Sequence, residues 1–139
     1  MLPNKCRKRR LKATRLCLLA AFAFHRMTGA AWAENLTPGQ APYAEHCLSC
    51  HQADGGGVPF VNPALAGGVI TTGPSDLLIG FVLAGSGDST DGEWENPMPG
   101  FAHLDDKALA AILTYVRTSF GNKAAPIDAS EVAAARAQK

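Results

Sequence analysis

The chain has 139 residues, enough for one modest domain, and its formal net charge is only +1. This near-neutral value hides an uneven distribution, because eight of the 13 basic residues precede position 34 and all 12 acidic residues follow position 33. Without residues 1–33, five basic residues stand against 12 acidic ones, a formal charge of −7. That charge argues against nucleic-acid binding and for a basic face on any protein partner, although it could also serve solubility alone.

Residues 1–33 have the pattern of a secretory signal peptide. Seven basic residues between Lys5 and Arg15 precede a short apolar run over 16–24, and Ala31-Trp32-Ala33 forms a small-x-small cleavage site. The apolar run is too short to span a bilayer, although a retained membrane anchor stays an alternative. We therefore predict a signal peptide at 1–33 that is removed, a domain at 34–139, and a periplasmic location.

A helix is predicted over residues 37–50, from Thr37 to about the second of two closely spaced cysteines, Cys47 and Cys50. Thr37 is a suitable N-cap, and Pro38 suits the first helical position. Pro42 lacks a backbone donor, so either the helix begins nearer Pro42 or its first turn is distorted. Tyr43 lies one helical turn before the first cysteine of the motif, so we expect it to pack inward.

The sequence Cys47-Leu48-Ser49-Cys50-His51 is the most informative stretch of the chain. This spacing is typical of the attachment site of a c-type haem. Each thiol can add to one vinyl group of the porphyrin, and His51 is then held beneath the iron as a ligand. The alternatives are a redox-active thiol pair, half of a zinc site, or a structural disulfide.

The stretch after this motif is predicted to be loop. Gly55-Gly56-Gly57 follows no strand and precedes no Gly-Lys-Ser/Thr, so it is not a phosphate-binding loop. Pro59 and Pro63 keep the next residues extended. Pro63-Ala64-Leu65 lies far enough beyond the motif to loop back to the ring.

Three further helices are predicted. The first covers 74–84, where apolar residues recur at a spacing of three to four, and Gly85 ends it. The second covers 105–120, with acidic residues at its start, Arg117 near its end and Gly121 as a left-handed C-cap. The third begins near Asp128, which can form a capping box with Glu131. Since no segment has a convincing strand pattern, the domain is predicted to be mostly α-helical.

Met98 is the best candidate for a sixth ligand of the haem iron. It is the only methionine beyond residue 33, and Pro97 and Pro99 restrict the backbone on both sides of it. A thioether stabilises ferrous iron and closes the site, which suits electron transfer. The alternatives are that Met98 only fills the core, or that His46 or His103 is the ligand.

These motifs resemble those of class I cytochromes c over essentially the whole of 34–139. The resemblance rests on the first-helix pattern, the proline loop, the axial methionine and the last long helix, namely Gly39, Tyr43, Cys47-x-x-Cys50-His51, Pro63-x-Leu65, Met98 and Leu113-Thr114-Tyr115-Val116-Arg117. It implies an all-α fold of a few short helices around one covalent haem c. It also implies that the carbonyl of Pro63 accepts a hydrogen bond from the imidazole of His51.

Several longer motifs are similar to those of the cytochrome modules that serve periplasmic alcohol, sugar or aldehyde dehydrogenases. They are Cys-x-x-Cys-His-x-x-x-Gly-x-Gly-Val-Pro, Pro-Ala-Leu-Ala-Gly, Met-Pro-Gly-Phe, and Leu-Thr-Tyr-Val-Arg-x-Ser-Phe-Gly-Asn followed by Ala-Pro. Two positions depart from the pattern: Gln52 stands where many members have glycine, and Pro42 falls within the first helix.

The resulting hypothesis is a monohaem electron carrier with no catalytic residue. It would accept electrons from a dehydrogenase and pass them to an oxidase or another cytochrome of the respiratory chain. No nucleic acid and no membrane span of the mature chain are expected. The predicted haem-binding residues are Cys47, Cys50, His51, Pro63, Leu65 and Met98, with His51 and Met98 on the iron, Phe81 and Phe101 packing on the ring, and Trp94 donating to a propionate. The alternatives are a haem enzyme or gas or redox sensor with an open or labile sixth position, and a thiol oxidoreductase.

Overall fold

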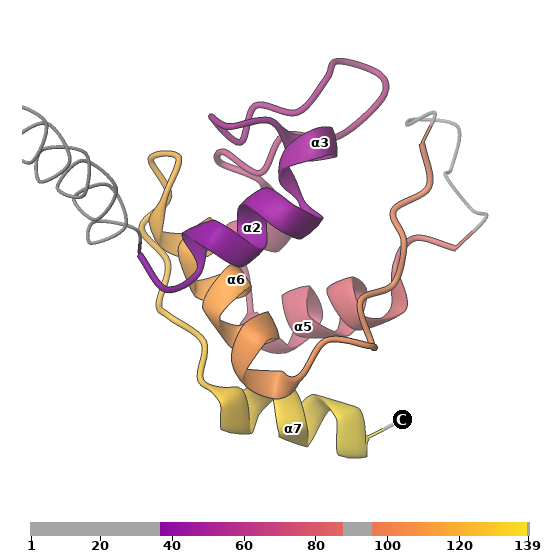
Figure 1. Ribbon diagram of the computed structural model, residues 1–139, viewed down its shortest axis with the longest axis vertical. Coiled ribbons are helices and arrows are strands. Elements are labelled where there is room, and N and C mark those ends of the chain that lie inside the picture. Colours follow the sequence, from indigo (N-terminus) through magenta and orange to yellow (C-terminus); the bar gives the residue numbers. More distant parts are fainter. Residues whose placement is uncertain (1–36, 88–95, 139) are drawn as a thin grey trace, which may run out of the picture. The chain divides into compact units, whose positions relative to one another are not determined.

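The computed structural model describes residues 37–87 and 96–138, which form a helical unit (Figure 1). Its elements in chain order are α2 (Gln40–His46), α3 (Leu48–His51), α4 (Val69–Thr72), α5 (Ser75–Ala84), α6 (Asp106–Thr118) and α7 (Ala129–Ala137). Within these ranges the extended pairing is limited to one isolated bridge between Val58 and Asn62. The prediction of an all-α fold is therefore confirmed. The predicted signal peptide and Trp94 lie outside the described residues.

Across 37–87 and 96–138, no helix combines the length and the apolar character needed to cross a membrane.

The first predicted helix does not start at Thr37 and is not continuous; of the two alternatives that Pro42 left open, the start nearer that proline is the one observed. Helix α2 begins at Gln40 with Gly39 as its N-cap, and the helical path is interrupted at Cys47 before α3 begins. Pro42 is the third residue of α2, where a backbone N–H has no acceptor within the helix. The proline therefore removes no hydrogen bond, and its fixed φ angle favours a start just before it.

Helix α2 crosses α6 at a contact that requires glycine at position 39 (Figure 1). A Cβ atom on Gly39 would overlap the carbonyl oxygen of Ala111 and would lie 2.6 Å from Cβ of Tyr115. One turn further on, Tyr43 is 2% exposed, and its ring centroid lies 5.2 Å from that of Tyr115 and 5.4 Å from that of Phe120. The expected inward packing of Tyr43 is confirmed.

The main core lies between α5, α6 and α7, and α7 packs against both other helices (Figure 1). The residues of this core share apolar character and near-complete burial: Leu78, Ile79, Val82, Leu83, Phe101, Leu109, Ala110, Leu113, Ile127 and Val132. The predicted helix over 74–84 and the capping box between Asp128 and Glu131 are both confirmed. Helix α6 ends at Thr118, before the predicted cap at Gly121, and the one-turn helix α4 was not predicted.

Arg117 links α6 to two other segments of the chain. The sequence analysis predicted only that it lies near the end of the helix. Its side chain is buried, with 5% exposure for the residue. Nη1 donates to the carbonyl oxygens of Thr71 (3.0 Å) and Gly73 (2.8 Å), and Nε donates to that of Ala125 (2.7 Å). The guanidinium thereby fixes α4 and the segment before α7 against the end of α6.

Candidate haem site

His51 is the last residue of α3 and is 7% exposed. Its Nδ1 lies 3.0 Å from the carbonyl oxygen of Pro63, which can only accept, so Nδ1–H is the donor. Burial lowers the pKa of His51, and the hydrogen bond to Pro63 opposes this shift without cancelling it. The ring is therefore a neutral imidazole whose Nε2 carries a lone pair, the form in which histidine binds a metal.

The two thiols precede this imidazole by four residues and by one. Cys47 and Cys50 are both free and partly buried, and the short helix α3 carries Cys50 and His51 side by side. Burial, and next the neighbouring Cys50, raises the pKa of Cys47 to about 11. Cys47 is thus a protonated thiol at neutral pH.

The loop that carries Pro63 and Leu65 is fixed by hydrogen bonds to two distant segments. The N–H of Leu65 donates to the carbonyl oxygen of Gly55 at 2.7 Å. Asn122, only 6% exposed, donates from Nδ2 to the carbonyl oxygen of Leu65 (3.1 Å) and accepts at Oδ1 from the N–H of Gly67 (2.8 Å). The sequence analysis assigned no such role to Asn122. An amide side chain directly after the glycine that follows α6 is the signal that could have suggested it.

Met98 lies on a separate segment, at the C-terminal end of α5. It is partly buried and packs against the main core. Its N–H donates to Oγ of Ser86 (2.8 Å), and its carbonyl oxygen accepts from the N–H of Ser86 (3.0 Å). The neighbouring Phe101 N–H donates to the carbonyl oxygen of Val82 (2.9 Å). These bonds fix the backbone of Met98, while its role as an iron ligand stays a prediction.

The two rival histidines form a surface cluster with Phe101. The ring centroids of His46 and His103 lie 6.4 Å apart, and those of His46 and Phe101 lie 6.2 Å apart. Phe101 is itself part of the main core. Both histidine rings thus pack edge-on or tilted against other rings.

Large apolar side chains are left uncovered in one part of the chain. The exposed ones among the described residues all lie between positions 48 and 81: Leu48, Phe60, Val69, Ile70, Leu77 and Phe81. Leu77 and Phe81 lie on the side of α5 that does not face the main core. Exposed apolar side chains, two free thiols and a neutral imidazole are the kinds of group that a covalently bound porphyrin requires.

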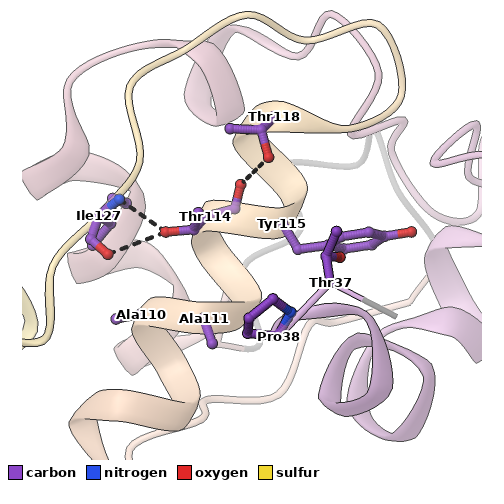
Figure 2. A pocket seen from close by; sticks show the side chains of 9 residues that line it. Thr37, Pro38, Ala110, Ala111, Thr114, Tyr115, Thr118 and Ile127 are labelled. Carbon is purple, nitrogen blue, oxygen red and sulfur yellow. Dashed lines mark hydrogen bonds between the residues drawn. The ribbon is translucent and has the colours of Figure 1, made fainter. Parts of the chain in front are cut away.

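Figure 2 shows a pocket elsewhere, between the residues before α2 and the outer side of α6. None of the predicted haem-binding residues lines it. Two of its hydroxyl groups are hydrogen-bonded within the chain: Oγ1 of Thr114 donates to the carbonyl oxygen of Ile127 (3.1 Å) and accepts from its N–H (2.9 Å), and Oγ1 of Thr118 donates to the carbonyl oxygen of Thr114 (2.8 Å). This pocket is therefore separate from the candidate haem site.

Comparison with known proteins gives matches that agree with this site. The chain is 38% identical over 93 residues to the cytochrome c subunit of alcohol dehydrogenase (quinone) from Gluconacetobacter polyoxogenes, which covers 63% of this chain and 19% of that protein. It is 40% identical over 111 residues to the fructose dehydrogenase cytochrome subunit of Gluconobacter japonicus, which covers 73% of this chain and 22% of that protein. The chain thus spans about a fifth of the length of these dehydrogenase subunits.

A third relative is closer in size. Cytochrome c-552 of Thermus thermophilus is 31% identical over 129 residues, which covers 84% of this chain and 85% of that protein. The cytochrome c family profile matches residues 36–120, which include both thiols, His51 and Met98. The chain therefore belongs to the cytochrome c family, the electron-transfer proteins that bind haem c covalently.

Proposed function

We propose that this chain is a periplasmic one-electron carrier in which Cys47 and Cys50 bind the porphyrin covalently and His51 and Met98 bind the iron. The observation that carries the proposal is the hydrogen bond from Nδ1 of His51 to Pro63, which leaves Nε2 of a buried neutral imidazole as a ligand beside two free thiols. When bound, the haem supplies a one-electron ferric/ferrous couple.

The chain's own residues set the properties of that couple. The carbonyl of Pro63 fixes the tautomer and orientation of His51 and raises its basicity as a ligand. The thioether of Met98 favours ferrous iron and so raises the reduction potential. If His51 and Met98 both bind the iron, no position is left for a substrate, which would suit electron transfer.

A periplasmic dehydrogenase is the proposed electron donor, and an oxidase or a second cytochrome is the proposed acceptor. Two of the similar proteins support this proposal, because they are named as cytochrome subunits of an alcohol dehydrogenase and of a fructose dehydrogenase. The formal charge of −7 beyond residue 33, from five basic and 12 acidic residues, favours partners with a basic face. The pattern of residues 1–33 supports export.

The raised pKa of Cys47 weighs against a thiol oxidoreductase. Such an enzyme needs an attacking thiolate, and its cysteine pKa is lowered for that purpose. Burial shifts the pKa of Cys47 in the opposite direction, to about 11. A thiol that stays protonated until it forms a thioether agrees better with these surroundings.

Two measurements on the mature protein test the proposal. Intact mass should equal that of the polypeptide plus one haem, and a bare polypeptide after maturation in a competent host would refute it. Met98→Ala should lower the reduction potential by at least about 120 mV, equivalent to a hundredfold loss in preference for ferrous iron. It should also let the ferrous protein bind carbon monoxide.

His103→Ala is the matched control, since His103 is the rival ligand nearest to Met98 in sequence. It should leave the potential and the response to carbon monoxide unchanged. If the unmodified ferrous protein already binds carbon monoxide or turns over peroxide at neutral pH, the alternative of a haem enzyme or sensor is favoured instead.

A further inference from the structure

The segment that carries Met98 has very few backbone donors. Pro97 and Pro99 have no N–H, so Met98 provides the single main-chain donor of residues 97–99. That donor is bound by Oγ of Ser86 at 2.8 Å. The carbonyl oxygen of Met98 is bound by the N–H of the same serine at 3.0 Å. One residue therefore binds both main-chain polar groups of Met98.

The contact is close because the residue before this serine is glycine. Gly85 ends α5 with a φ of 75°, in the left-handed region that favours glycine. A Cβ atom there would lie 2.5 Å from the carbonyl oxygen of Met98 and 2.6 Å from N of Gly100. The two segments thus touch along their backbones.

We propose that Ser86 is a positioning residue for Met98 and that its hydroxyl controls how readily another ligand displaces the methionine from the iron. This inference rests on the proposed ligand role of Met98. With the main chain of Met98 bound on both sides, the freedom left to the thioether is mainly that of its own side-chain torsions. The sulfur is thereby kept at a high effective concentration next to the iron, which opposes a competing ligand.

Imidazole binding to the ferric holoprotein measures this directly, because imidazole competes with Met98 for one position. Loss of one typical hydrogen bond corresponds to about a tenfold change in an equilibrium constant. Ser86→Ala should therefore bind imidazole about tenfold more tightly than the parent. Ser86→Thr keeps a hydroxyl, so its imidazole affinity should stay within about twofold of that of the parent. If Ser86→Ala accumulates poorly, Ser86→Gly replaces it and should show the same increase in imidazole affinity.

Thr118→Ala is the matched control for removing a hydroxyl. Oγ1 of Thr118 also makes a 2.8 Å hydrogen bond, to the carbonyl oxygen of Thr114, but on the outer side of α6. This control should leave imidazole affinity unchanged. In the Met98→Ala background, Ser86→Ala should also have no effect, because no methionine is left to position.

Three outcomes would overturn the inference. The first is an unchanged imidazole affinity in Ser86→Ala while the ferric protein keeps its sulfur-to-iron charge-transfer band, which would remove the role of Ser86 and leave Met98 as the ligand. The second is an equal effect of Ser86→Ala with and without Met98, which would indicate a general structural role. The third is absence of that band from the parent protein, which would overturn the ligand role of Met98 itself and this inference with it.

Discussion

Helices α5 and α6 pack in one core, yet they bury their surfaces in different ways. Helix α6 is amphipathic, with Leu109, Ile112, Leu113 and Val116 buried and polar residues on its outer side. Helix α5 is apolar nearly all round, and Asp76 is its one charged residue. One side of α5 is buried in the core, while Leu77 on the other side is 61% exposed and Phe81 is 36% exposed.

A helix that is apolar on all sides is built to be covered on all sides. Among the described residues, α6 is covered by the core, whereas Leu77 and Phe81 on the outer side of α5 stay exposed, so we expect a second apolar body to cover this side of α5. Covalent haem c fits that need. The region around α6 should therefore be stable through its own packing, whereas the region from α3 to α5 should depend on the haem.

The largest effect is expected from removing the haem. In the variant that combines Cys47→Ser with Cys50→Ser, we expect amide protection to be lost over residues 48–84 and to persist in α6, where Leu109 is fully buried. Hydrogen exchange followed by mass spectrometry, with the haem-loaded parent as reference, measures this. Equal protection of both segments without haem would show that the comparison between α5 and α6 is mistaken.

The contact between α2 and α6 can be broken without touching the haem side. Gly39→Val places atoms where the Ala111 carbonyl already lies, so we expect a loss of about 3 kcal/mol in the free energy of unfolding. Gly80→Ala is the matched control, because a Cβ atom on Gly80 meets nothing within 4 Å, and it should gain about 1 kcal/mol from helix propensity. Denaturant unfolding of the haem-loaded variants measures both changes. An unchanged free energy of unfolding in Gly39→Val would contradict the close contact between α2 and α6.

The outer face of α5 is tested by Phe81→Ala in the haem-loaded protein. Truncating a solvent-exposed side chain usually changes stability by less than about 0.5 kcal/mol. If haem covers Phe81, the loss should instead reach about 2 kcal/mol. Guanidinium unfolding monitored by far-UV circular dichroism gives the free energy of unfolding. A loss of less than about 0.5 kcal/mol would indicate that Phe81 does not contact the haem.

A smaller gain is expected next to His51. Gln52 has φ 63° and ψ 169°, a conformation almost restricted to glycine. We expect Gln52→Gly to stabilise the protein by about 1 kcal/mol, because relief of this strain exceeds the added entropy of the unfolded chain. Gln52→Ala keeps the strain and serves as the control. Thermal unfolding in which the glycine variant melts below the alanine variant would refute this explanation.

The smallest effect concerns the first residue of α5, where Oγ of Ser75 donates to Oε1 of Glu131 at 2.8 Å. The backbone N–H of Asp128, and next the Ser75 hydroxyl, lowers the pKa of Glu131 below its usual value of 4.5. The ionised form therefore contributes stability above about pH 4.5, and this contribution is lost as the pH falls through the lowered pKa. Glu131→Gln should be less stable than the parent at pH 7, and the difference should shrink in acid. A difference that does not change with pH would contradict this role.

The helices that follow from local rules were predicted well. Helices α5 and α6 lie within two residues of the expected bounds, and α7 starts within one residue of its expected start, because apolar spacing and caps such as Asp105 and Asp128 act within a few residues. The haem motif was equally clear from spacing alone. Its hydrogen bond to Pro63 was expected only from the family resemblance, and the structure contains it.

The features that were missed depend on contacts between distant residues. Helix α4 consists of Val69-Ile70-Thr71-Thr72, a β-branched run with little helical preference of its own. Ser86 acts on a residue 12 positions away and Asn122 on one 57 positions away, so neither role has a local pattern. The strain at Gln52 gives a physical reason to expect glycine at this position, which the family resemblance indicated only as a departure.

The buried guanidinium of Arg117 has a consequence for the order in which the protein is assembled. A polypeptide is synthesised from its amino end, so the two thiols and His51 exist well before Arg117 and Ala125 do. During that interval the carbonyl oxygens of Thr71 and Gly73 lack the guanidinium donor that they have in the folded domain. The haem-attachment motif therefore lies in a part of the chain that is made early, whereas the hydrogen bonds that hold Thr71 and Gly73 form only after the carboxyl-terminal third is present.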